Sequence, residues 1–200
     1  MTLTCEVTRA VTRINADEDL DVQAFFEAFD PPAGFRAELI EGAIVLSPTP
    51  VGRHGFILDQ LYDCFLSTNR PEGTAVPRSP LTISLPDMPE SSMYIPDLAV
   101  VDEKVRDEDS TWKFPASVFH LVVEVVSRSN KSDDRLIKPK GYASGPVPLF
   151  LLIDPLAGQV TLYSEPRDRE YRANITVPFG GKIPFPHPFS GVLDTSIFVR

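Results

Sequence analysis

The sequence has little cysteine, histidine and tryptophan, and it has no long hydrophobic run. Its 200 residues include two cysteines, three histidines and one tryptophan. Cys5 and Cys64 are far apart and lack metal-ligand spacing, so the sequence offers neither a disulfide framework nor a zinc or iron site. No run approaches about 18 apolar residues, as a membrane-spanning helix requires, and residues 1–21 lack the apolar segment of a secretory signal. We therefore expect a cytoplasmic protein without a membrane partner.

Positive charge is also scarce. The net charge is −9 at pH 7, which argues against a protein that wraps a polyanion. The segment 128–140 is the exception, because its five basic and two acidic residues give it a net charge of +3 and leave −12 for the rest of the chain. Such a run is most often the solvated face of a helix. It becomes interesting for function only if it lies beside other unusual residues.

The order of the elements predicts a single α/β (α+β) domain. Helical periodicity predicts helices at 19–29, 53–66 and 132–143. Strand patterns occur at 37–48 (a hairpin around Glu41-Gly42), 74–86, 94–101, 119–126 and 148–155, and in a hairpin around Pro166. Residues 1–16 lack periodicity, so we expect a flexible N-terminal arm followed by one domain over 17–200. The proline-punctuated tail is expected to lie over the core.

Two of the predicted strands each carry a carboxylate at an otherwise apolar position. Asp97 lies in "IPDLAVV" and Glu124 lies in "LVVEVV". A buried carboxylate without a partner costs several kcal/mol, and consecutive strands often pair at a spacing of about 4.8 Å. The two side chains would then be close enough to share one cation. Mg²⁺, with Mn²⁺ as a substitute, suits a site of two carboxylates that also accepts phosphate oxygens.

The helix that follows offers a lysine for the same site. Asp134, Lys138 and Tyr142 have i, i+4, i+8 spacing and share a helix face. An ammonium group there would hold a scissile phosphate or assist an attacking water. The alternative is a metal-free protein in which the two strand carboxylates form ion pairs with Arg128 or Arg135.

This ordered set of motifs resembles the PD-(D/E)xK nuclease superfamily and, more closely, the Uma-two family of restriction-endonuclease-like proteins. The matching stretches span about residues 37–195 and are "AELIEGAIVLSPTPVGRHGFIL", "IPDLAVVDE", "LVVEVVSRSNKSDDRLIKPKGYASGPVPLFLLIDP" and "LDTS". The resemblance implies a mixed central β-sheet flanked by helices, with additional β-hairpins. It also implies a Mg²⁺-dependent endonuclease that hydrolyses DNA phosphodiester bonds. A homodimer would be compatible with this activity, since nucleases that cut both strands often dimerise.

Carried over residue by residue, the resemblance assigns a role to each motif. It makes Asp97 and Glu124 the metal ligands, Lys138 the catalytic lysine and Glu38 a further acidic residue of the catalytic site. The expected substrate-binding residues are His54, Lys140, Arg128 and Lys131, while Tyr142 is attributed to packing. We expect Asp97→Asn or Glu124→Gln to abolish cleavage and to leave the fold intact or slightly stabilised, because like charge is removed.

The sequence departs from the superfamily pattern at two positions. Val126 stands where the strand lysine would be, and Pro139 directly follows Lys138. Because proline disturbs a regular helix, Lys140 stays the alternative to Lys138 as the lysine that faces the site. A different function also stays open: a nuclease fold with weak or no catalysis that serves as a binding or scaffolding module. The net charge of −9 favours it, since a DNA enzyme ordinarily has a larger basic surface.

Overall fold

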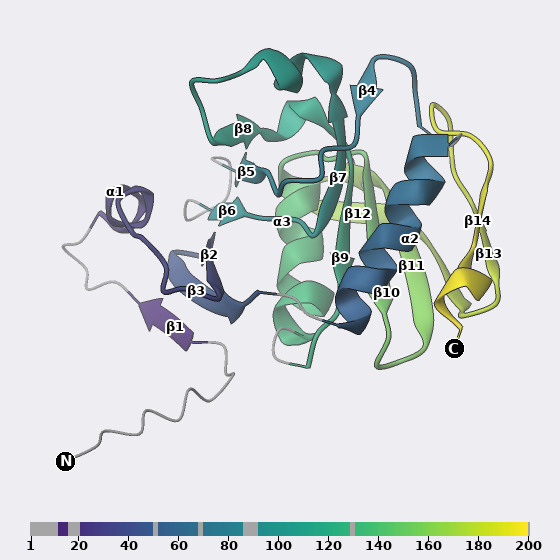
Figure 1. Cartoon of the computed structure of the whole chain (residues 1–200), viewed down its shortest axis with the longest axis horizontal. Coiled ribbons are helices and arrows are strands. Elements are labelled where there is room, and N and C mark those ends of the chain that lie inside the picture. The colour runs from purple at the N-terminus through teal and green to yellow at the C-terminus, as the bar shows by residue number, and fades with distance from the viewer. Residues whose placement is uncertain are drawn as a thin grey trace.

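Two six-stranded β-sheets form the framework of the structure, which is a computed structural model (Figure 1). It describes residues 12–15, 21–49, 52–67, 70–85, 92–128 and 131–199. In spatial order, the first sheet contains β1 (Thr12–Asn15), β3 (Ala43–Pro48), β2 (Phe35–Ile40), β6 (Ser92–Tyr94), β5 (Thr82–Leu85) and β8 (Lys113–Pro115). The second sheet contains β12 (Glu170–Pro178), β11 (Gln159–Arg167), β10 (Leu149–Asp154), β9 (Phe119–Val125), β7 (Leu98–Asp102) and β4 (Thr74–Ala75).

The second sheet is mixed and lies at the centre of the fold. Its strands β9 and β10 are parallel, whereas β7 and β9 are antiparallel. The remaining elements are α1 (Val22–Glu27), α2 (Arg53–Ser67), the π-helical turn η3 (Asp133–Ile137), α3 (Lys138–Ser144), the strand pair β13 (Lys182–Pro184) and β14 (Val192–Asp194), and the 3₁₀ turns η1 (Glu103–Asp107), η2 (Ala116–Val118) and η4 (Thr195–Phe198). The predicted fold class, a mixed central sheet flanked by helices with additional hairpins, is confirmed.

Alternation along the buried strands decides which helix covers which face. Val123 and Val125 of β9 belong to one hydrophobic cluster, together with Leu61 of α2 and Phe185 of the tail. Val122, on the other face, belongs to a second cluster with residues of α3 and of the first sheet. Since side chains alternate between faces with a period of two, the continuous apolar run of β9 is explained by burial on both sides. The tail does cover the core, as the sequence predicts.

Several sequence predictions are confirmed in outline and corrected in detail. The hairpin of β2 and β3 turns at Glu41 and Gly42, both with positive φ (48° and 71°), as a two-residue turn requires. The hairpin of β11 and β12 turns at Asp168 and Arg169 instead of at Pro166, which is paired inside β11. The prolines at 77 and 80 divide the predicted strand 74–86 into β4 and β5. Strand β8 was not predicted.

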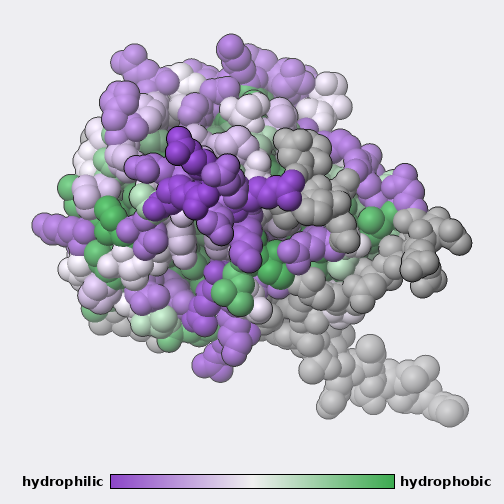
Figure 2. Space-filling view, turned by 180° about the vertical axis from the view of Figure 1, so that it is seen from behind, coloured by the Kyte–Doolittle hydropathy of each residue, from purple (hydrophilic) through white to green (hydrophobic). Residues whose placement is uncertain are grey.

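The N-terminal prediction is corrected where the structure describes it. Residues Thr12–Asn15 of the expected arm form β1, which pairs with β3; residues 1–11 and 16 lie outside the described residues, as do 19 and 20 of the first predicted helix and residue 86. No helix in the described part of the chain is long and apolar enough to cross a membrane. Seen from behind, the surface is mostly hydrophilic, and its hydrophobic residues form small separate groups (Figure 2).

Candidate functional site

Asp97 lies directly before β7, and its side chain contacts β9 next to Glu124. The antiparallel pairing of β7 and β9 aligns Leu98 with Val123. The backbone N–H of Asp97 donates to the carbonyl of Val123 at 3.0 Å, and the N–H of Val125 donates to Asp97 Oδ2 at 2.9 Å. The predicted pairing of the two segments is therefore confirmed, but the predicted strand 94–101 is divided into β6 and β7, and Asp97 lies between them.

The ammonium group of Lys138 lies among three carboxylates. Its Nζ is 2.9 Å from Glu124 Oε1, 3.1 Å from Glu38 Oε1 and 3.6 Å from Asp134 Oδ1. All four side chains are at most 3% exposed. The hydroxyl of Tyr142 donates to Glu124 Oε1 at 2.6 Å. Two donors therefore fix the orientation of the Glu124 carboxylate.

Asp97 is held by a different pair of groups. Arg36 Nη1 donates to Asp97 Oδ1 at 2.7 Å, and His54 Nε2 lies 3.1 Å from Asp97 Oδ2. Arg36 comes from β2, two residues before Glu38, so both side chains lie on one face of that strand. His54 lies in the first turn of α2. Five segments of the chain thus meet at the carboxylate cluster, which we define as Glu38, Asp97, Glu124 and Asp134.

The backbone around Lys138 explains why this lysine, and not Lys140, is buried. The π-helical turn η3 ends at Ile137, and α3 begins at Lys138 with Pro139 in its first turn. Proline is tolerated there because the N–H groups of a first turn have no partner within the helix. The expected kink at Pro139 is thus replaced by a change of helix type before it. Lys140, about 200° further around the helix, is exposed.

A close approach of α3 to the first sheet positions the same lysine. A Cβ atom at Gly141 would lie 2.4 Å from a ring carbon of Tyr94, which is fully buried. Only glycine permits this distance, since the ring of Tyr94 has no space to move. The ring of Tyr142 packs edge-on against Tyr94 at 5.4 Å between centroids. Tyr142 packs in the core as predicted, and its hydroxyl also contacts Glu124.

The cluster carries more negative than positive charge. Its four carboxylates face two permanent cations, Arg36 and Lys138, which leaves −2 when every carboxylate is ionised. Burial, the nearby carboxylates adding to it, raises the pKa of Glu124 well above its ordinary value and that of Asp134 to about 7. Burial acts in the same direction on Asp97, but Arg36 and then His54 outweigh it and hold its pKa below the ordinary value. Lys138 stays charged, because Glu124 and Glu38 raise its pKa despite burial.

The donor atoms of the cluster suit a hard divalent cation. Glu38 Oε2 and Glu124 Oε2 are buried oxygens without a hydrogen-bond partner, and the surplus charge of −2 equals the charge that such an ion would neutralise. Within the described ranges, no group of three or more Asp, Glu, His or Cys side chains is arranged so that it could hold a metal ion by itself. An ion would therefore be held by one or two protein carboxylates and would complete its shell with water and phosphate oxygens, which is usual for Mg²⁺.

Other predicted site residues lie away from the cluster. Lys131 and Lys140 are exposed, and so is Arg128 in the turn after β9. Arg135 pairs with Asp154 at 2.7 Å, so the alternative in which Arg128 or Arg135 bridges the strand carboxylates is replaced by pairing with Arg36 and Lys138. Arg36 and Asp134 were not predicted as site residues. The two-residue spacing of Arg36 and Glu38 was the available signal for the first, and the shared helix face with Lys138 for the second.

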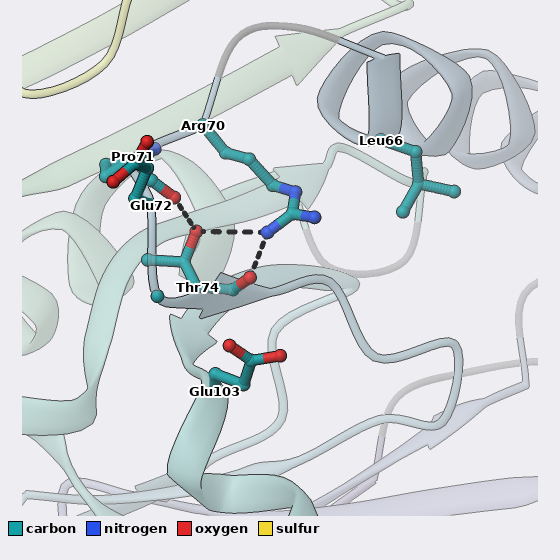
Figure 3. A pocket seen from close by; sticks show the side chains of 7 residues that line it. Leu66, Arg70, Pro71, Glu72, Thr74 and Glu103 are labelled. Atoms are coloured by element: carbon teal, nitrogen blue, oxygen red, sulfur yellow. Dashed lines mark hydrogen bonds between the residues drawn. The ribbon is translucent and has the colours of Figure 1, made fainter.

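A separate pocket of about 340 Å³ lies at the C-terminal end of α2 (Figure 3). Arg70 reaches across it to the carbonyl of Thr74, and the Thr74 hydroxyl donates to the carbonyl of Pro71 at 2.6 Å. Figure 3 shows these groups turned toward one another, with Glu103 on the opposite side. No residue of the carboxylate cluster lines this pocket. Its polar contacts are those of a loop that stabilises its own turn.

Comparison with known proteins gives one family and one fold. Residues 22–195 match the family model of Uma2, described as "Putative restriction endonuclease". The crystal structure of a "putative nuclease belonging to DUF820" from Anabaena variabilis is similar, with a TM-score of 0.66 and 16% sequence identity over 90% of this chain and 97% of that chain. At this identity the similarity shows a common fold. Among curated proteins, the chain has no match.

Proposed function

Because the chain belongs to the Uma2 family, we propose that it is a metal-dependent endonuclease that hydrolyses phosphodiester bonds of DNA at the carboxylate cluster. The observation that carries this proposal is the buried charge surplus. When fully ionised, four carboxylates around Lys138 and Arg36 leave −2, and three of their buried oxygens have no hydrogen-bond partner. A structural ion-pair network would gain by balancing its charges, since an uncompensated buried charge is costly. In a site that binds a divalent cation, the bound ion would neutralise the surplus negative charge.

Asp97 and Glu124 would hold the ion, Mg²⁺ or Mn²⁺, with Glu38 beside them. When bound, such an ion supplies Lewis-acid chemistry, because it polarises the phosphoryl group and lowers the pKa of water. Arg36 and His54 orient the Asp97 carboxylate, and Tyr142 orients that of Glu124. Lys138 contributes a fixed positive charge beside the position where negative charge develops on the phosphate. The exposed Lys131 and Lys140, together with Arg128, are suited to contacts with more distant phosphates.

Nicking of supercoiled plasmid DNA tests this proposal. We expect cleavage by the wild type with Mg²⁺ or Mn²⁺, no cleavage in EDTA, and none by Glu124→Gln, which keeps the shape of the side chain and removes its charge. Glu103→Gln is the matched control, because Glu103 is 54% exposed and lies outside the cluster; it should cleave as the wild type does. Equal nicking by the wild type and Glu124→Gln would disprove a catalytic role for the cluster.

A nuclease fold that serves as a binding module is the second candidate. It is favoured by the protein groups that already pair with the carboxylates, Arg36 with Asp97 and Lys138 with Glu124, and by the net charge of −9. A wild-type protein that binds Mn²⁺ in calorimetry and does not nick DNA would support this candidate. The cytoplasmic location and the homodimer stay predictions.

A further inference from the structure

An aromatic pocket of about 380 Å³ lies beside the first sheet. Its aromatic walls come from three parts of the chain: Phe26 and Phe29 from α1 and the residues after it, Phe35 from β2, and Trp112 from the segment before β8. Trp112 is 49% exposed, although its ring lies 6.4 Å from that of Phe26. A large aromatic side chain that leaves half its surface to solvent in a pocket offers a face for a planar ligand.

Two lining residues connect this pocket directly to the carboxylate cluster. Arg36 lines it and donates to Asp97 Oδ1 at 2.7 Å. Ile95 also lines it, and its backbone N–H donates to Glu38 Oε1 at 2.8 Å. The pocket wall is therefore one hydrogen bond away from two of the four carboxylates. A group bound in the pocket would be adjacent to whatever is bound at the cluster.

Arg36 also has a donor to spare. Its Nε is buried and has no hydrogen-bond partner, while its Nη1 is occupied by Asp97. The Arg36 side chain as a whole lines the pocket and is 18% exposed, and its guanidinium charge suits a phosphate oxygen of a ligand. At the other side of the pocket, Glu27 and Lys113 pair with each other, and Lys113 Nζ lies 5.9 Å from the centre of the Trp112 ring.

We propose that this pocket binds a nucleobase that is unstacked from the DNA strand whose phosphodiester lies at the carboxylate cluster. This inference rests on the proposed function. Bases stack on aromatic side chains without regard to sequence, since every base has a π-face. Arg36 supports this occupant because it joins the pocket to the phosphate position. An apolar side chain of a protein partner would fill the same walls but would have no use for the guanidinium charge of Arg36.

Binding of single-stranded DNA in EDTA tests the pocket without cleavage. The probes are a fluorescein-labelled oligothymidylate of about 12 nucleotides and a strand of the same length made of abasic nucleotides. Fluorescence anisotropy gives the dissociation constants at low salt. We expect the wild type to bind oligothymidylate about 5- to 100-fold more tightly than the abasic strand, which is the range for stacking of one base. Because Trp112 is the one tryptophan of the chain, its emission should be quenched by oligothymidylate and not by the abasic strand.

Substitutions at Trp112 separate stacking from general apolar contact. Trp112→Phe keeps a π-face and should bind oligothymidylate within a few-fold of the wild type, whereas Trp112→Leu should bind it about as weakly as the abasic strand. Phe25→Leu is the matched control, because Phe25 is 43% exposed on α1 and does not line the pocket. Circular dichroism spectra that match those of the wild type show that each variant is folded.

The outcomes distinguish the pocket from the function on which it rests. Equal affinity of the wild type for both strands, or of Trp112→Leu and the wild type for oligothymidylate, overturns the nucleobase assignment while plasmid nicking stays intact. The aromatic walls would then suit an apolar side chain of a protein partner. A wild type that neither binds oligothymidylate nor nicks plasmid overturns the proposed function and the pocket assignment together.

Discussion

Replacing Lys138 with methionine tests how the carboxylate cluster is held together. Methionine has nearly the length of the lysine side chain, so the core stays filled and the change is mainly the loss of charge. Lys138 is fully buried and contacts Glu124, Glu38 and Asp134 at 2.9, 3.1 and 3.6 Å. Without it, the fully ionised cluster would carry −3 instead of −2. We expect the free energy of unfolding at pH 8 to fall by about 3–5 kcal/mol, the usual cost of removing one partner from a buried ion pair.

The loss should depend on pH in one direction. Burial raises the pKa of Glu124 above its ordinary value and that of Asp134 to about 7 in the folded protein, and loss of the ammonium raises both further. The folded state then binds more protons than the unfolded state, so the free energy of unfolding falls as the pH rises from about 5 to 8. The difference between Lys138→Met and the wild type should therefore be smaller at pH 5 than at pH 8.

Urea denaturation in EDTA, followed by the emission of Trp112, measures both effects. For a slope of about 2 kcal/mol per molar urea, the midpoint at pH 8 should fall by about 2 M. Lys140→Met is the matched control, because Lys140 is exposed on the same helix, and it should change the free energy of unfolding by less than about 0.5 kcal/mol. A Lys138→Met protein within about 1 kcal/mol of the wild type at pH 8, or a loss that does not vary with pH, would refute this reasoning.

Three further predictions concern Asp97, Glu124 and the binding of Mg²⁺. Asp97→Asn should abolish nicking and lower the free energy of unfolding by about 3 kcal/mol, since Arg36 loses its buried partner; a melting temperature equal to that of the wild type would restore the expectation from sequence that the fold is unaffected. Glu124→Gln should stay within about 1 kcal/mol of the wild type in urea at pH 7 in EDTA, because burial favours the uncharged form; a loss of several kcal/mol would mean that its charge is needed. Mg²⁺ at about 100 times its dissociation constant should raise the free energy of unfolding of the wild type by about 2.7 kcal/mol, and this gain should vanish in Glu124→Gln if that residue holds the ion.

The sequence predicted the parts of the site that depend on local periodicity. The apolar patterns predicted two neighbouring strands at Asp97 and Glu124, and the pairing of β7 with β9 brings Asp97, directly before β7, next to Glu124. The i, i+4 spacing of Asp134 and Lys138 likewise put both side chains on one face of the helix, and both reach the cluster. These features depend on residues within one or two neighbouring elements, for which a period of two or of 3.6 is sufficient information.

The partners of Asp97 could not be predicted in the same way. Arg36 is 61 residues away from Asp97 in sequence, and His54 comes from helix α2. The contacts of Arg36 and His54 with Asp97 depend on how the first sheet and α2 pack against the second sheet, which no local pattern encodes. The sequence alternative of an ion pair with a nearby arginine was therefore correct in chemistry and wrong in residue. The prediction for Asp97→Asn therefore changes from an intact or slightly stabilised fold to a substantial loss of stability.

The departure of the sequence at Val126 is explained by the position of Lys138. Two residues after Glu124, Val126 is 3% exposed and packs with Val122 in the cluster that includes Tyr142. A lysine side chain is not needed there, because the Lys138 ammonium group reaches Glu124 Oε1 from the helix. Together with the Tyr142 hydroxyl, it occupies this oxygen and leaves Oε2 without a partner. Lys138 therefore places a positive charge in the carboxylate cluster and still leaves one oxygen of Glu124 available to a ligand.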